Sequence, residues 1–274
     1  MKDQGEPLAR IAEALERLAP AAAAPVDWRA APAYVWHGQA RAVEQLIAPA
    51  LDLLKGIEAQ KQAVVANVAR LAAGHAAHDM LLWGSRGMGK SALLRAAVLS
   101  AQAGNPARIA LVQVAPEALG SLAELFAALA CQPRSFLVFI DDLGFEEHDS
   151  AGPRALRSWL EGGIEARPGN VRIAVTSNRR AIVPRHLSEQ DNPINPRDAV
   201  DDRLALADRF GLSVGFHNCS QDDYLAIVGG YCTEHGLEWD QAEALEWSKR
   251  RGARSGRVAW QFVTELAGRA GKPL

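Results

Sequence analysis

One short segment of the chain has the residue types and spacing of a phosphate-binding loop. Residues 84–91 read GSRGMGKS, which is Gly-x4-Gly-Lys-Ser. Glycines let the backbone bend so that successive N–H groups converge on phosphate oxygens. Lys90 would bring a compact positive charge to the β- and γ-phosphates, and Ser91 would bring a hydroxyl to Mg²⁺. The pattern predicts a triphosphate site formed by Gly84, Ser85, Arg86, Gly87, Met88, Gly89, Lys90, Ser91 and Ala92.

A second segment supplies the acids that such a site needs. Residues 136–140 are a run of apolar residues that ends in Asp141 and Asp142. Open α/β sheets bind ligands at the carboxyl ends of their strands, and a phosphate-binding loop needs a carboxylate there to hold Mg²⁺. We therefore assign Asp141, with Ser91, to the metal. Asp142 is the candidate for polarising the attacking water, and Glu146 is the alternative base. By itself, a buried strand with a solvated turn would explain the run equally well.

The pattern around both segments predicts an α/β fold. Strands are expected at residues 80–83, 108–114, 136–140, 171–176 and 212–216, and helices at 39–55, 57–73, 91–103, 121–130 and 153–164. Strands that alternate with helices form a parallel sheet covered on both faces. We expect a three-layer P-loop core at residues 36–219, preceded by an amphipathic helix and linker at 1–35. Residues 220–274 show only helical patterns and are expected to form a helical lid.

Bulk properties exclude several classes of protein. The net charge is −2 and the cysteines number 3, without a Cys-x-x-Cys pair, which argues against global attraction to nucleic acid and against a disulfide framework. No window is apolar enough to span a bilayer, and the first residues lack the apolar run of a signal peptide. We expect a cytoplasmic protein with no membrane partner.

Together these residues resemble the AAA+ ATPases, and more narrowly a bacterial AAA+ family catalogued as a domain of unknown function. The narrow resemblance extends from about residue 57 to the end and depends on residues 82–84, 141–147, 160–168, 176–180 and 207–212. It implies that the core binds ATP with Mg²⁺ and that the helical lid closes over the nucleotide.

The resemblance also implies roles for residues outside the loop. Ile57 belongs to a segment that would lie against the adenine. Asn178 resembles the sensor residue, although a capping asparagine is the simpler alternative. Arg209 resembles an arginine finger that reaches a neighbouring subunit, and a salt bridge to a nearby aspartate is its alternative. Arg257 resembles the second sensor, with Arg254 as the alternative, and a solvated basic cluster would also explain both.

Two departures from the AAA+ pattern bear on function. Asp142 stands where most members have glutamate, and residues 118–120 lack the aromatic of a protein-threading loop. We expect an ATPase that hydrolyses Mg-ATP as a homo-oligomer and remodels an unknown protein partner. A switch or adaptor that binds ATP without hydrolysing it is the first alternative. A nucleic-acid loader ranks third, because the chain has a balanced charge and no recognisable DNA-reading module.

Overall fold

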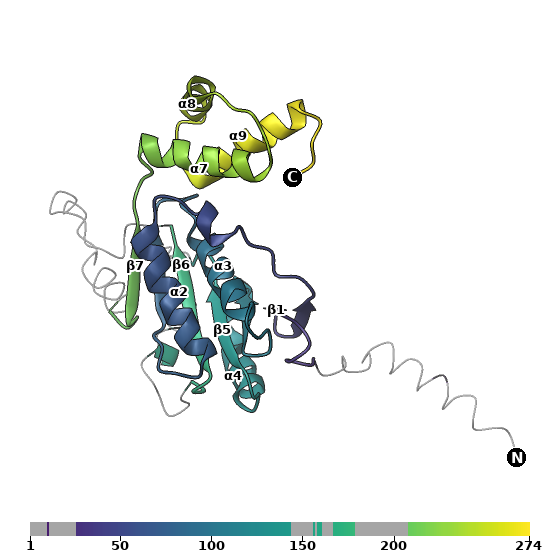
Figure 1. Ribbon diagram of the computed structural model, residues 1–274. Helices are drawn as coiled ribbons and strands as arrows, with labels where there is room; N and C mark the ends of the chain where they lie inside the picture. Colours follow the sequence, from purple (N-terminus) through teal and green to yellow (C-terminus); the bar gives the residue numbers. More distant parts are fainter. Residues whose placement is uncertain (1–9, 11–25, 144–155, 157, 161–166, 179–207) are drawn as a thin grey trace, which may run out of the picture.

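The computed structural model in Figure 1 describes residues 10, 26–143, 156, 158–160, 167–178 and 208–274. The helix expected near the N-terminus and most of the helix expected at residues 153–164 lie outside these ranges, as does Glu146.

The five strands predicted from the sequence all form. They are β3 (Met80–Gly84), β4 (Ile109–Val114), β5 (Ser135–Ile140), β6 (Val171–Ser177) and β7 (Leu212–Phe216). They run parallel to one another in the order β4-β5-β6-β3-β7. Because parallel strands end at the same edge, the carboxyl ends of β3, β5 and β6 lie side by side.

Side chains that alternate along the strands build one apolar core on each face of the sheet. One core contains Leu82 and Leu137 together with α2 (Glu58–Ala72) and α3 (Lys90–Gln102). The other contains Leu81 and Val138 together with the 3-10 helix η2 (Pro116–Ser121) and α4 (Leu122–Ala130). Successive strand residues point to opposite faces, so these buried strands need apolar residues at both positions. The three-layer α/β expectation is confirmed.

The helix expected at residues 39–55 is wrong. This region contains strand β2 (Ala40–Val43) and the 3-10 helix η1 (Leu51–Leu53). Strand β1 (Ala33–Trp36) precedes it and adds to β4, and β2 pairs antiparallel with β1. Pairing with β1 provides backbone partners for β2, and this contact outweighs the local helix propensity of residues 40–43. The pairing of β1 with β4 buries Tyr34 and Trp36. Strand β1 thus crosses the boundary expected between residues 35 and 36.

Three helices follow β7 and lie over the carboxyl ends of the strands (Figure 1). They are α7 (Gln221–Glu234), α8 (Gln241–Arg250) and α9 (Gly256–Arg269). Ser220, Asp240 and Ser255 each cap one helix with a side-chain oxygen that accepts a backbone N–H. Across the described ranges, every helix is too short or too polar to cross a membrane.

Candidate nucleotide-binding site

The loop after β3 adopts backbone angles that favour glycine. Gly84, Gly87 and Gly89 have φ values of 124°, 75° and 87°. At Gly84 there is also no room for a side chain, because a Cβ atom would lie 2.1 Å from the carbonyl oxygen of Phe216 in β7. The glycines at these positions of the motif therefore follow from the bend and from the close approach of β7.

Helix α3 begins directly behind this loop. Its N-cap is Gly89, which makes no side-chain capping bond, so the N–H groups of the first turn remain available to an acceptor other than a cap. Such a helix start attracts anions through its N–H groups and its dipole. Ser91 and Ala92 lie half-buried in this first turn. The local backbone fits a phosphate group.

The Lys90 ammonium is buried beneath the loop and held by three oxygens. Nζ donates to the carbonyl oxygens of Gly84 at 2.8 Å and Ser85 at 2.9 Å, and to Oδ1 of Asn178 at 3.0 Å. Burial lowers the Lys90 pKa below its usual 10.5, nearby Arg257 and Arg86 lower it further, and two aspartates partly offset this. The buried ammonium, with two arginines near enough to affect its pKa, favours an anionic ligand.

The metal-side pair predicted from the sequence lies in direct contact. Ser91 Oγ donates to Oδ1 of Asp141 at 2.6 Å, so the start of α3 meets the end of β5. Among the described residues, no group of three or more His, Cys, Asp or Glu side chains could hold a metal alone. A Mg²⁺ ion here would therefore take Ser91 and Asp141 on one side and phosphate oxygens and water on the other, which suits its preference for oxygen ligands.

The other two predicted polar residues meet beside this pair. Asp142 is exposed and has a φ of 52°, and Nδ2 of Asn178 donates to its Oδ1. Asn178 follows β6, as predicted, and its amide bridges the Lys90 ammonium and the Asp142 carboxylate. The structure therefore brings Lys90, Ser91 and three polar residues of the two neighbouring strand ends into one cluster.

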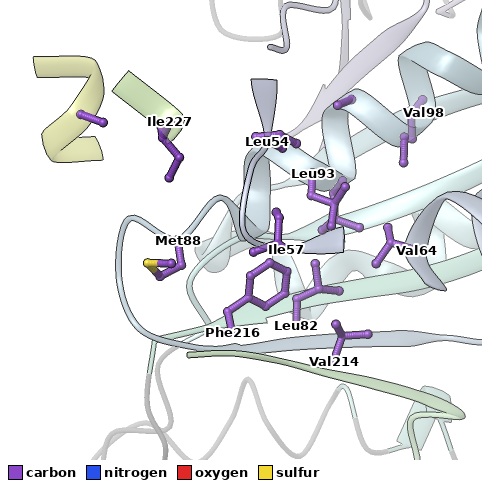
Figure 2. Packing of buried hydrophobic residues seen from close by; sticks show 14 of the residues in the cluster. Leu54, Ile57, Val64, Leu82, Met88, Leu93, Val98, Val214, Phe216 and Ile227 are labelled. Carbon is purple, nitrogen blue, oxygen red and sulfur yellow. The ribbon is translucent and has the colours of Figure 1, made fainter. Parts of the chain in front are cut away.

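An apolar wall of core residues lies against the loop near Ile57, where the resemblance expects adenine, with Leu54 and Ile57 each 3.7 Å from the Cβ position of Gly89. Ile57 is 4% exposed and belongs to the same cluster as Leu54, Met88 and Ile227, which Figure 2 shows around the loop. Met88 comes from the loop and Ile227 from α7, so the wall joins the core to the lid. An apolar wall of this kind suits a flat aromatic base.

The lid also touches the loop directly. The N–H of Arg257, at the start of α9, donates to the carbonyl oxygen of Gly87 at 3.3 Å. A Cβ at Gly87 would lie 2.9 Å from Oγ of Ser255, which confirms how closely α9 approaches. The Arg257 side chain itself is exposed.

Arg209 lies elsewhere. It is half-buried in the turn before β7, at the amino end of that strand. Leu212 pairs with Met80 and Phe216 with Gly84. The start of β7, near Arg209, is therefore four residues away from the level of Gly84, where the loop begins. Four residues span about 13 Å along a strand. The structure therefore does not bring Arg209 to the loop of its own chain.

Two polar residues near the loop received no role from the sequence. Thr176 in β6 is 1% exposed and contacts both acids, and Asn218, just after β7, accepts a hydrogen bond of 2.5 Å from Oγ of Ser85. Threonine is common in strands, so Thr176 gives no signal beyond a strand residue. Asn218 is 133 residues away from its partner, so no local pattern connects them.

Solved structures share this architecture. The Thermotoga maritima RuvB Holliday junction branch migration motor matches with a TM-score of 0.52 and 18% identity, over 83% of this chain and 68% of that one. The Aeropyrum pernix ORC1 protein, solved with DNA, gives 0.56 and 17%, over 80% and 62%. The FIGL-1 AAA domain, solved with ADP, gives 0.51 and 17%, over 82% and 75%. At such identities the likeness shows the fold alone, which is the AAA+ P-loop fold.

The family comparison covers the whole candidate site. No curated protein sequence matches the chain. One family model matches residues 29–270, a range that holds the loop, both acids and the lid helices. The chain belongs to the family described as "Protein of unknown function (DUF815)".

Proposed function

We propose that this protein binds and hydrolyses Mg-ATP and uses the cycle to remodel a protein partner. The observation that carries the proposal is the 2.6 Å contact between Ser91 and Asp141, beside the buried Lys90 ammonium. The Ser91 hydroxyl, the Asp141 carboxylate and the Lys90 ammonium all lie at one bent, amide-rich loop. This supports a site in which the first two groups hold a metal and the ammonium faces phosphate, as phosphoryl transfer requires. The AAA+ fold and the apolar wall around Ile57 favour ATP.

Each residue would act by position and charge. The loop and the first turn of α3 would hold the phosphates, while Lys90 would exchange one of its carbonyl acceptors for a phosphate oxygen. Ser91 and Asp141 would hold Mg²⁺, which would supply charge neutralisation at the phosphates. Asp142 would accept a proton from the attacking water, and Asn178, already bonded to Asp142, would orient that water.

Removal of the Lys90 charge tests the nucleotide site. We expect Lys90→Ala to weaken ATP binding at least about a hundredfold, because a buried cation next to phosphate is worth several kcal/mol. Lys249→Ala is the control, since Lys249 is an exposed lysine on α8. Titration with a fluorescent ATP analogue measures the affinity, and phosphate release measures turnover. Equal affinity in both variants would refute the site.

The position of Arg209 motivates the second part of the proposal, a homo-oligomer. Because Arg209 lies at the edge of the sheet away from its own loop, it could reach a γ-phosphate only in a neighbouring subunit. We expect Arg209→Ala to retain ATP binding and to lose turnover. Native mass measurements with and without ATP and Mg²⁺ should show subunits assembling.

A mixing experiment separates action between subunits from action within one. Arg209→Ala subunits carry an intact loop, and Lys90→Ala subunits carry an intact Arg209. Mixed assemblies therefore contain complete sites, and turnover should return when the two inactive variants are combined. A mixture that assembles but stays inactive would contradict the proposed role of Arg209.

The alternative is a switch that binds ATP without hydrolysing it. The Asp142 carboxylate already accepts a hydrogen bond from Asn178, and aspartate has a shorter reach than the usual glutamate. Steady phosphate release by the wild type that Asp142→Asn abolishes, with ATP affinity retained, would exclude the switch. Tight ATP binding with turnover no faster than in Asp142→Asn would favour it.

A further inference from the structure

One hydroxyl group connects the two acids of the site. Oγ1 of Thr176 donates to Oδ1 of Asp141 at 2.6 Å and accepts the backbone N–H of Asp142 at 2.8 Å. Thr176 is 1% exposed, so neither bond competes with bulk water. The pairing of β5 with β6 ends at Ile140 and Val175, which places Thr176 directly beside Asp141, one step further along both strands.

The bond to Asp141 fixes the orientation of that carboxylate. Its Oδ1 atom accepts both the Thr176 hydroxyl and the Ser91 hydroxyl, each at 2.6 Å. Two donors hold Oδ1, so the direction of the second carboxylate oxygen, Oδ2, is also fixed. Because Ser91 Oγ is the donor in its bond, its lone pairs remain free to bind a metal. Without Thr176, the Asp141 side chain could rotate about its χ angles while keeping only the Ser91 contact.

The bond to Asp142 holds an unusual backbone bend. Within the described ranges, Asp142 is the one residue other than glycine with a positive φ, at 52°. That left-handed conformation is disfavoured for L-residues, and aspartate tolerates it better than most. Thr176 accepts both N–H groups at the bend, that of Asp142 at Oγ1 and that of Leu143 at its carbonyl oxygen, 2.9 Å away. The bend directs the Asp142 carboxylate to Asn178.

We propose that Thr176 is a positioning residue for ATP hydrolysis, which sets the Asp141 carboxylate for Mg²⁺ and the Asp142 carboxylate for the attacking water. This inference rests on the proposed function. It also gives a physical reason for Asp142: a left-handed bend at this position suits aspartate better than the glutamate of most AAA+ proteins.

The test uses Thr176→Val, which keeps the shape of the side chain and removes the hydroxyl, and Thr176→Ser, which keeps the hydroxyl. Ser177→Ala is the matched control, because Ser177 is the equally buried neighbour on β6. Electron paramagnetic resonance of Mn²⁺ with a non-hydrolysable ATP analogue reports metal binding without turnover. Phosphate release reports turnover, and analogue binding in EDTA reports the loop alone.

In Thr176→Val, we expect Mn²⁺ affinity and turnover each to fall about tenfold to a hundredfold, the effect of losing a hydrogen bond to a charged group. Thr176→Ser and Ser177→Ala should stay within about threefold of the wild type, as should metal-free analogue binding by Thr176→Val.

Three outcomes would count against these roles. Wild-type Mn²⁺ affinity and turnover in Thr176→Val would overturn the inference alone. Equal losses of metal-free and metal-dependent binding would also overturn it, because they would indicate a merely structural role. A wild-type protein that binds neither the analogue nor its Mn²⁺ complex would overturn the proposed function, and this inference with it.

Discussion

Replacement of Gly84 by alanine tests the strand contact on which the loop depends. The added Cβ would lie 2.1 Å from the carbonyl oxygen of Phe216, 2.9 Å from its carbonyl carbon and 3.0 Å from its nitrogen. All three neighbours are backbone atoms of β7, so no side chain can rotate away. Gly84 also has a φ of 124°, which an alanine would adopt only under strain.

The size of the effect follows from these contacts. To bring the Cβ even to 3.0 Å from the oxygen, β3 and β7 must separate by about 0.9 Å, the difference between 3.0 and 2.1 Å. That separation would break the 3.0 Å bond from the Ser85 N–H to the Phe216 carbonyl, worth about 1 kcal/mol. Backbone strain and overpacking each cost about 1–3 kcal/mol. We expect a loss of about 3–7 kcal/mol in the free energy of unfolding.

Equilibrium unfolding in urea, followed by circular dichroism, measures this loss, and a melting temperature lower by about 10–20 °C should accompany it. Gly104→Ala is the control, because a Cβ at Gly104 would meet nothing within 4 Å. We expect that variant to stay within about 0.5 kcal/mol of the wild type. If Gly84→Ala lost less than about 1 kcal/mol, the close approach of β3 and β7 would be refuted.

Three further predictions test other parts of the structure. Arg134→Met should lower the free energy of unfolding in urea by about 3–5 kcal/mol, since the buried guanidinium donates to four backbone carbonyls; a change under about 1 kcal/mol would contradict this. Burial lowers the Lys90 pKa below 10.5, so as the pH rises the folded chain loses this proton at a lower pH than the unfolded chain does. Raising the pH through the interval between these two pKa values should weaken ATP binding, while Lys90 deprotonation favours the folded state. An affinity that stays constant up to pH 10.5 would oppose this. Burial raises the Cys219 pKa to about 11, whereas Cys131 is exposed, so a thiol reagent at pH 8 should label Cys131 rapidly and Cys219 only after unfolding; mass spectrometry of labelled peptides would detect the opposite order.

The parts of the site that the sequence predicts are those encoded locally or by strand order. Gly84 to Ser91 are one continuous segment from the end of β3 to the start of α3, so a local pattern is enough to recognise them. The contact between Ser91 and Asp141 joins residues 50 apart, but it follows once both are placed at the carboxyl ends of parallel strands. Asn178 was identified through the resemblance to the AAA+ sensor residue, and it lies just after β6.

The parts that the sequence does not predict depend on contacts between distant segments. Strand β1 forms because Pro32 to Trp36 find the open edge of β4, and the turn after it uses Gly38 with a φ of 82°. Short edge strands carry weak periodicity, so the residues of the neighbouring strand β2 also fit the helix that was expected at residues 39–55. The region before residue 33 was expected to be a linker, yet the Trp28 and Ala31 carbonyls are held by Arg134 from over 100 residues away.

The loop is tied to the lid by two separate connections. In the first, Ser85 bonds through its N–H to Phe216 and through its hydroxyl to Asn218, and this segment runs directly into α7. In the second, the carbonyl of Gly87 accepts the N–H of Arg257 at the start of α9. A loop held at both its entry and its crest cannot move independently of α7 and α9. Any shift of the loop on phosphate binding must therefore displace these helices or break one of these contacts.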